Sequence, residues 1–588
     1  MRAYLFLLLS FCLFTGAYNV DYVTIPDQNF EQKLIDLGVD SEGILDGRIL
    51  KTDAEATTEL YVQYSGIADL TGIEAFVNLQ VLYCNNNLLT SLDVSASPDL
   101  VRLYCYRNQL EDLNISGCTK LDRLYCLDNP LGELDVSDAT QLDRLYAWNN
   151  ELTHLDLTQN SNLHWLYIHY NQLSAIDVSY NEFVYNIEVG GNLLTSIDVT
   201  NNRDLQYLGV AENQISSLDL SQNLDLRRLE CYDNQLTALD ITVNTLLEDV
   251  HCNNNMISSI DVSVHPYLKN LSINHNQLTS LDVTNNPVLV NLDCRDNFIT
   301  SLDVTNNLEL DIFQCYDNDI GFLDLTNNTK LKLLYCGGNE LPSLDVTNCP
   351  DLQQLWCDRN HINQLDLTNN SQLLYVLCAR NEMTSLTLGS HPQLDSIDCM
   401  DNQITSLDLT GSPSLEKLVS RHNQLQGHMD MTQNPELYYL DFYDNQVSSV
   451  DVTQNPLLEH FECWRNNLTE LDVTHNPVLK YLDCDRNQLT ELDVTHNPEL
   501  WLLAFGFNQL TEIDLSANTV LDSLYCYYNQ LTQLDLSNNP SLSLLYCLDN
   551  ELEALDLSAN PMISKLWVSR NQIPELDLSG IPHLIQFY

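Results

Sequence analysis

The chain has 588 residues, of which 82 are acidic and 25 basic, so its formal net charge at pH 7 is −57. Nucleic-acid binding needs Lys and Arg to neutralise phosphates, and a chain this acidic is repelled by polyphosphates and by anionic membrane surfaces. Intrinsic disorder is excluded as well, because hydrophobic residues make up 44% of the chain and charged residues only 18%.

Residues 1–17 have the pattern of a signal peptide. Arg2 gives the positively charged start, an apolar run covers residues 5–14, and Thr15 to Ala17 are small residues suited to cleavage. This run is too short to cross a membrane core, which needs about 20 residues. We therefore expect an exported protein, secreted or held at a cell surface, with no membrane span once the signal is removed.

A short amphipathic helix is predicted within residues 18–59. Asp27 precedes Phe30 and Leu34, which follow each other at helical spacing, and Gly38 ends the apolar pattern. We expect this segment to form an N-terminal cap that covers one end of the structure that follows.

Residues 82–588 repeat every 21 residues, with one inserted residue near 427–428. One unit reads LxxLxCxxNxLxxLDVTxNPx, and 24 units fit. Each unit consists of two similar halves of ten and eleven residues, LxxLxCxxNx and LxxLDVxxNxx. A repeat of this length decides the fold, because each unit can bury its apolar residues only against its neighbours.

Both halves predict a short strand followed by a turn. Apolar residues two positions apart place alternate side chains inward, as in a strand. The Asn three residues later turns the chain, and its amide can bond backbone groups that stacked coils would otherwise bury unsatisfied. We predict a β-rich solenoid of about 25 stacked coils, each with two short parallel strands and Asn-ladder turns.

These motifs resemble the leucine-rich repeat family, and within it the bacterial class with nested ten- and eleven-residue halves. Residues 60–81 look like an opening repeat of the internalin type. With the preceding helix they resemble the N-terminal cap of surface leucine-rich repeat proteins of Bacteroidetes. The resemblance implies adhesion or protein recognition at a bacterial surface. We expect no C-terminal cap, because the residues up to 588 still follow the repeat.

Fifteen of the 18 cysteines fall in one inward column of the first half, beginning with Cys84 and Cys105. Elsewhere this column holds apolar residues such as Ala147, Val189 and Phe442, so we interpret the thiols as small buried hydrophobic groups. Disulfides would need a closer Cβ approach than neighbouring coils provide. Metal ligation would need CxxC pairs or paired His beside the cysteines.

An outward column of the second half carries Asp in 22 of 24 units. Carboxylates stacked about 4.8 Å apart repel each other. Ser or Thr follows two residues later in 23 units, and the exception has Thr387 and Gly389 in place of the pair. We expect the carboxylate and the hydroxyl to form hydrogen-bonded pairs. The alternative is a cation-binding ladder, for Ca²⁺ above all, at Asp282, Asp303, Asp324, Asp345 and Asp366.

The outward positions of the first strand vary, and a repeat protein keeps its binding specificity in such positions. The middle column opens with five tyrosines in successive coils, with arginines on one side and further rings on the other. Exposed aromatic patches mark binding sites. The candidate ligand-binding residues are Tyr83, Arg102, Tyr104, Tyr106, Arg123, Tyr125, Arg144, Tyr146, Trp148, Trp165, Tyr167 and His169.

Two residue sets invite a catalytic interpretation that we do not favour. Asp249, His251 and Ser272 form a formal triad, and a carboxylate column includes Asp441 and Asp483. An open solenoid face offers no oxyanion hole, and we expect that it cannot readily desolvate a carboxylate to raise its pKa. We predict that the chain is not an enzyme and needs no cofactor.

Taken together, these patterns predict a non-catalytic extracellular protein that binds a protein partner through the first-strand face. A carbohydrate-binding surface is the alternative, because flat rings also suit sugar faces. A structural spacer of a larger surface protein, stabilised by cations, is the second alternative.

Overall fold

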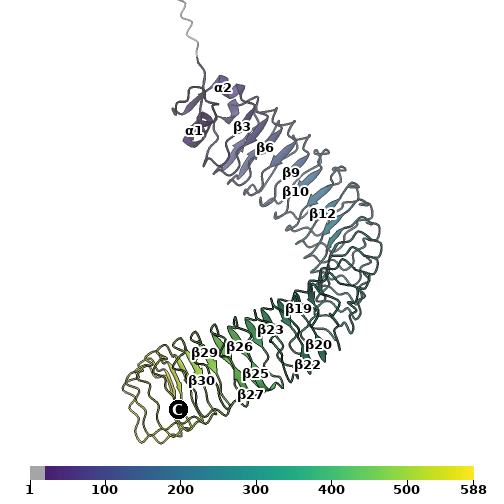
Figure 1. The fold of residues 1–588 in the computed structure, drawn as a ribbon. Helices are drawn as coiled ribbons and strands as arrows, with labels where there is room; N and C mark the ends of the chain where they lie inside the picture. Colours follow the sequence, from purple (N-terminus) through teal and green to yellow (C-terminus); the bar gives the residue numbers. More distant parts are fainter. Residues whose placement is uncertain (1–19) are drawn as a thin grey trace, which may run out of the picture. The chain divides into compact units, whose positions relative to one another are not determined.

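The computed structural model describes residues 20–588 (Figure 1). The predicted signal peptide at residues 1–17 lies outside the described residues. The chain divides into two compact units, Met1–Gln235 and Leu236–Tyr588. Each unit is a parallel β-solenoid, and together they contain about 25 turns with very little helix. The predicted fold class is confirmed.

The first unit begins with a small segment of mixed structure. Strands β1 (Tyr22–Thr24) and β2 (Arg48–Leu50) pair antiparallel. The predicted helix is present as α1 (Gln28–Asp36), and the Asp27 side chain caps it by accepting from the backbone N–H groups of Asn29 and Phe30. A second helix, α2 (Lys51–Ala56), and a 3-10 turn, η1 (Ile73–Ala75), complete the segment.

Two carboxylates fix this segment in place. Asp27 Oδ2 also accepts from the backbone N–H groups of Ala68 and Asp69, at 2.7 and 3.0 Å, which ties the start of α1 to the first repeat. Glu31 is 1% exposed, and its Oε1 accepts from three successive N–H groups in residues 46–48. A buried carboxylate needs such donors to replace its hydration.

In the first unit, the first half of each coil contributes one strand to a parallel sheet whose neighbours pair in register. The strands are β3 (Glu59–Tyr61), β4 (Val81–Tyr83), β6 (Arg102–Tyr104), β8 (Arg123–Tyr125), β9 (Arg144–Tyr146), β10 (Trp165–Tyr167), β11 (Asn186–Glu188), β12 (Tyr207–Gly209) and β13 (Arg228–Glu230).

The second unit has a sheet of the same kind (Figure 1). Its strands are β14 (Asp249–His251), β15 (Asn270–Ser272), β16 (Asn291–Asp293), β17 (Ile312–Gln314), β18 (Leu333–Tyr335), β19 (Gln354–Trp356), β21 (Tyr375–Leu377), β23 (Ser396–Asp398), β24 (Lys417–Val419), β26 (Tyr439–Asp441), β28 (His460–Glu462), β29 (Tyr481–Asp483), β30 (Leu502–Ala504), β31 (Ser523–Tyr525), β32 (Leu544–Tyr546), β33 (Lys565–Trp567) and β34 (Gln586–Phe587).

The second half of the coil is less regular than the sequence predicts. Within the described residues it forms three strand pairs and one isolated bridge, between Asp472 and Asp493. The Asp side chain accepts from the backbone N–H two residues on both in coils with this strand, as at Asp93, and in coils without it, as at Asp135, so this bond does not determine where the strand forms. The pairs join β5 (Ser91–Asp93) to β7 (Asp112–Asn114), β20 (Gln364–Asp366) to β22 (Ser385–Thr387), and β25 (Gln426–Asp430) to β27 (Gln446–Asp451).

The one inserted residue of the repeat falls in β25. The register between β25 and β27 shifts between Gly427 and His428, and Gly427 has a φ of +77°. Glycine accepts this left-handed conformation without steric cost. The insertion is therefore absorbed by a local bulge on the outer surface, and the following coil resumes the repeat.

The Asn ladder joins successive coils, as predicted. Asn318 donates through Nδ2 to the carbonyls of Cys294 in the preceding coil and Cys315 in its own, at 3.0 and 3.1 Å. Its Oδ1 accepts from the backbone N–H of Ile299 at 2.9 Å. The same pattern recurs along both units. Each buried amide thus satisfies backbone groups that the turn leaves unpaired.

The residue before each of these Asn side chains adopts a left-handed φ. The non-glycine residues at this position have φ values of 50–57°, and Gly191 and Gly338 occupy it in two coils. For a residue with a Cβ, this conformation costs about 1–2 kcal/mol. The Asn hydrogen bonds stabilise the turn enough to hold it in every coil.

All 17 cysteines among residues 20–588 are buried and free. They lie among inward Leu, Ile and Val side chains, where Cys84 and Cys105 are 0% exposed. Burial raises the pKa of the thiol in this column, as at Cys126 and Cys252, so the groups stay neutral. They act as small apolar side chains, as the sequence indicates.

Candidate recognition face

The five predicted tyrosines form a continuous stack of rings on β4, β6, β8, β9 and β10. Parallel register places Tyr83, Tyr104, Tyr125, Tyr146 and Tyr167 beside one another. Neighbouring ring centroids are 4.0–4.7 Å apart, with interplanar angles of 8–23°. Each ring is half-buried, so the stack is part of the surface.

A sixth ring, which the sequence analysis missed, extends the stack. Tyr61 on β3 lies opposite Tyr83, with ring centroids 5.2 Å apart and planes at 25°. The signal was present, because Leu60 and Val62 mark a strand in the opening repeat and leave Tyr61 outward between them. We call Tyr61 and the five predicted tyrosines the tyrosine stack.

The stack presents ring edges to solvent rather than ring faces. Each inner ring has a neighbour on both sides at stacking distance, so its faces are covered. Burial, followed by the charges of its ring neighbours Tyr125 and Tyr167, raises the pKa of Tyr146 to about 12. The Tyr146 phenol is therefore neutral at physiological pH, and the stack offers hydroxyl groups along an aromatic ridge.

The arginine column beside the stack is less positive than its sequence indicates. Arg123 Nε lies 3.3 Å from Asp122, and Arg144 Nε donates to Asp143 at 3.1 Å. Arg102 is exposed and has no ion pair within residues 20–588. Two of the three charges are thus matched by acidic neighbours, which leaves a mixed polar margin rather than a basic patch.

The rings on the other side of the stack are only partly brought together. Trp148 and His169 stack at 4.9 Å, and Trp148 meets the edge of Tyr146 at 5.8 Å. Tyr106 lies apart from them, because Leu127 takes the same position in the coil between. Trp165, on the arginine side, has Arg144 Cζ 5.1 Å from its ring centroid.

Shorter stacks occur on the second unit. Tyr439, His460 and Tyr481 stack at 4.4 and 4.2 Å, and Tyr546 and Trp567 stack at 3.9 Å. Stacking of outward rings is therefore common in this chain, and the tyrosine stack of the first unit differs in its length of six rings.

Comparison with known proteins identifies the fold. No protein-family model and no curated protein sequence matches the chain. The plant peptide hormone receptor RGFR1, solved in complex with RGF2, superposes with a TM-score of 0.71 at 19% identity, over 90% of this chain and 95% of that chain. The LRR ectodomain of the receptor kinase GASSHO1/SCHENGEN3 from Arabidopsis thaliana gives 0.59 at 19% identity, over 90% and 78%. This chain is a leucine-rich repeat solenoid.

The functional domain of InlJ from Listeria monocytogenes, which includes a cysteine ladder, is 26% identical over 82% of this solenoid and 79% of that chain, with a TM-score of 0.42. Residues 20–588 contain no helix that is long and apolar enough to cross a membrane.

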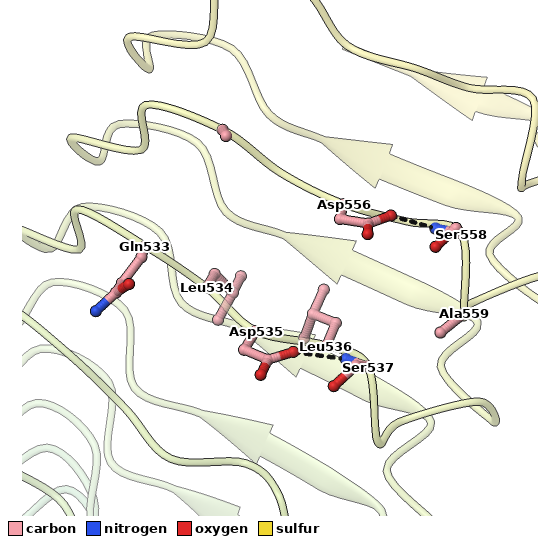
Figure 2. A pocket seen from close by; sticks show the side chains of 9 residues that line it. Gln533, Leu534, Asp535, Leu536, Ser537, Asp556, Ser558 and Ala559 are labelled. Atoms are coloured by element: carbon pink, nitrogen blue, oxygen red, sulfur yellow. Dashed lines mark hydrogen bonds between the residues drawn. The ribbon is translucent and has the colours of Figure 1, made fainter.

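The outward Asp column of the solenoid forms hydrogen-bonded pairs, as predicted. Figure 2 shows two neighbouring coils, in which the Oδ1 atoms of Asp535 and Asp556 accept from the backbone N–H groups of Ser537 and Ser558 at 2.9 Å. In most coils with Thr at this position, the hydroxyl also donates, as from Thr305 to Asp303 at 2.7 Å. The side-chain and backbone bonds from Thr305 lower the pKa of Asp303, with the side-chain bond the larger cause.

The alternative cation ladder remains a prediction. In Asp282, Asp303, Asp324 and Asp345 one carboxylate oxygen accepts from both the hydroxyl and the backbone N–H of Thr, and in Asp366 it accepts from the N–H. Within the described part of the solenoid, no three His, Cys, Asp or Glu side chains converge as a metal-binding group.

One expectation about the carboxylates of the solenoid face is wrong. Asp441 is 0% exposed, and burial raises its pKa to about 6, with Glu462 as the next cause. Burial and the charge of Asp485 raise the pKa of Asp483 to about 8. Arg421 of the preceding coil donates through Nη1 to Asp441 Oδ2 at 3.1 Å. The outward face of the sheet therefore desolvates a carboxylate after all.

The formal triad residues are engaged in other contacts. Ser272 Oγ donates to Asn274 Oδ1 at 3.0 Å, and Asn270 donates to the Asp249 carboxylate. These amide contacts fit a structural role for the hydroxyl and the carboxylate.

Proposed function

We propose that this chain is an exported, non-catalytic protein that binds a protein partner through the outward face of the first-strand sheet in its first unit. The contact would centre on the tyrosine stack, with Arg102, Trp148 and His169 at its margins. The signal-peptide pattern of residues 1–17 supports an extracellular setting.

The observation that carries this proposal is the geometry of the tyrosine stack. Five half-buried rings and the exposed ring of Tyr61, each held by its neighbours, give a rigid ridge with hydroxyl groups along it. Tyr, Trp and Arg dominate the energetic centres of protein interfaces. Rings that are already immobilised lose little conformational entropy on binding, which favours affinity.

The same geometry disfavours the carbohydrate alternative. A sugar ring packs flat against an exposed aromatic face, whereas the inner rings of the stack cover one another at 4.0–4.7 Å. The pairing of Arg123 and Arg144 with acidic neighbours also reduces attraction for anionic polysaccharides. A protein surface, which can accept hydrogen bonds and pack on ring edges, fits better.

The test compares binding by the wild-type chain with binding by a triple variant, Tyr104→Ser, Tyr125→Ser and Tyr146→Ser. Immobilised protein is exposed to solubilised surface proteins and to purified polysaccharides, and each captured protein is purified and its Kd measured. We expect the triple variant to weaken binding to the partner by at least about tenfold, because the central rings of an interface carry most of its energy.

Two controls separate binding from folding. Tyr525 and Tyr546 of the second unit stack with ring centroids 4.9 Å apart, and the double variant Tyr525→Ser, Tyr546→Ser should leave the Kd unchanged. The conservative triple change of Tyr104, Tyr125 and Tyr146 to Phe keeps the rings stacked and tests the hydroxyl groups alone. Equal capture by the wild type and the Ser variant would refute the proposal and favour the spacer, and capture of polysaccharide alone would favour the carbohydrate alternative.

A further inference from the structure

A hollow of about 280 Å³ lies at the end of the tyrosine stack. After Tyr167 the outward column changes character, because the next coils place Glu188, Gly209 and Glu230 in line with it. Its lining includes Tyr167, His169, Glu188, Gly190, Glu212 and Glu230.

Small residues make this hollow. Gly209 is buried, and a Cβ at this position would overlap the carboxylate of Glu188. A Cβ at Gly190 would lie 3.0 Å from Glu188 Oε1 and 3.1 Å from the carbonyl oxygen of Ala211. The glycines therefore allow the Glu188 side chain to lie against the sheet, and the space outside it stays open.

Aromatic rings form the walls. Tyr167 has a stacking partner in the column on one side only, Tyr146, because the next coil has Glu188 in place of a ring. It is the ring of the stack that borders the hollow. His169 adds a ring nitrogen, Nδ1, that is buried and has no hydrogen-bond partner within residues 20–588. Burial lowers the pKa of His169, so the neutral ring can accept a hydrogen bond there.

The charge of the hollow is negative. Tyr207 donates its hydroxyl to Glu188 and, at 3.0 Å, to Glu230, and Arg228 Nε donates to Glu230 at 2.8 Å. Glu212, which also lines the hollow, is exposed. Three carboxylates thus face one arginine. Burial raises the pKa of Glu188, with nearby Glu230 contributing, and a cation in the hollow would stabilise both charges.

We infer that this hollow receives an arginine side chain of the partner protein, with its guanidinium plane against Tyr167 and its N–H groups directed at Glu188 and Glu212. This inference rests on the proposed function, and it specifies the partner side chain that contacts the hollow. A planar guanidinium stacks on an aromatic ring and donates to carboxylates in the same plane, which the compact ammonium of lysine cannot do.

The chain contains an internal example of the same contact two coils further on. Arg228 Cζ lies 5.5 Å from the centroid of Tyr207, while its Nε donates to Glu230. An arginine of a partner would repeat this arrangement against Tyr167 and Glu188. Charge complementarity favours such a partner, because the chain carries a net charge of −57.

The experiment measures binding of N-acetyl-arginine amide to the full chain by saturation-transfer NMR and titration. N-acetyl-citrulline amide, an uncharged analogue of similar shape, and N-acetyl-lysine amide serve as ligand controls. The variants are Glu188→Gln, which removes the charge, and Gly209→Ala, which displaces the Glu188 side chain. Glu133→Gln, an exposed site on the same unit, is the matched control for charge.

We expect the arginine amide to bind, the citrulline amide to give no signal, and Glu188→Gln to weaken binding at least about fivefold, because charge-assisted hydrogen bonds are lost. Glu133→Gln should leave affinity unchanged. The inference is overturned if the arginine amide does not bind, if Glu188→Gln binds it as well as the wild type, or if the lysine amide binds equally well.

These outcomes are independent of the test of the proposed function. If the tyrosine variant loses partner binding and the wild type does not bind the arginine amide, only the inference that the hollow receives an arginine side chain is refuted. Arginine binding together with unchanged capture by the tyrosine variant would refute the tyrosine stack as the recognition face.

Discussion

The Asn ladder should dominate the local stability of each coil, and Asn318→Ala tests this. Asn318 is 7% exposed and makes hydrogen bonds of 2.9, 3.0 and 3.1 Å to one backbone N–H and two carbonyls. The change leaves the buried N–H of Ile299 without a partner and removes one of two donors from each carbonyl, because Cys294 still accepts from Asn297 and Cys315 from Asn339. At about 1–3 kcal/mol for the unsatisfied N–H and about 0.5–1.5 kcal/mol for each lost bond to a carbonyl, with some relief from rearrangement, we expect a loss of about 2–4 kcal/mol.

The matched control is Asn306→Ala. Asn306 belongs to the same coil region but is exposed, and its single side-chain bond, to the Thr284 carbonyl, is 3.2 Å long. We expect this change to cost less than about 0.5 kcal/mol.

Hydrogen exchange followed by mass spectrometry is the suitable assay, because a solenoid opens coil by coil and a single global transition would average over many coils. Peptides covering residues 294–320 should lose protection in Asn318→Ala, while distant coils keep theirs. The reasoning is refuted if Asn318→Ala lowers the local opening free energy by less than about 1 kcal/mol, or if both variants lose the same amount.

Three further outcomes are expected. Gly191→Ala should lower the melting temperature, because Gly191 has a φ of +62° and an added Cβ would overlap the ring of Tyr170, whereas Gly321→Ala, with open space around it, should be neutral. Because the pKa of Asp483 is raised, the folded state keeps a proton that the unfolded state releases, and the free energy of unfolding falls as pH rises from about 4 to about 8. The Asp483→Asn variant should lose this part of the pH dependence. In urea titrations at pH 8 it should be more stable than the wild type by about 1–3 kcal/mol. Millimolar Ca²⁺ should shift the melting temperature no more than matched ionic strength does, and a larger shift would support the cation ladder.

The repeat made most of the fold predictable. A strict period of 21 residues places each outward residue beside its equivalent in the next coil, so the contact between Tyr83 and Tyr104 follows from the sequence alone. The Asp and hydroxyl pairs were predictable for a further reason, since Thr387 and Gly389 replace both members in one coil. The non-repeating start offered no such guide, and α2 and the anchoring of Glu31 were not predicted.

Contacts between side chains of different columns could not be predicted from the sequence. The neutralisation of Arg144 by Asp143, and the bonds from Tyr207 to Glu188 and Glu230, depend on side-chain rotamers that no periodic pattern specifies. The same holds for the burial of Asp441 and its ion pair with Arg421. The pattern of a single column therefore predicts the tyrosine stack but not the hollow at its end.

The inward thiol column has a consequence for the lifetime of the folded chain. Six successive coils, from Cys294 to Cys399, each hold one buried, neutral thiol that oxidants cannot reach while the coils stay closed. If several coils open under oxidising conditions, these thiols become exposed together at high local concentration and can couple in non-native pairs that prevent closure. The lifetime of the folded protein would then depend on the rate at which its coils open rather than on its equilibrium free energy of unfolding.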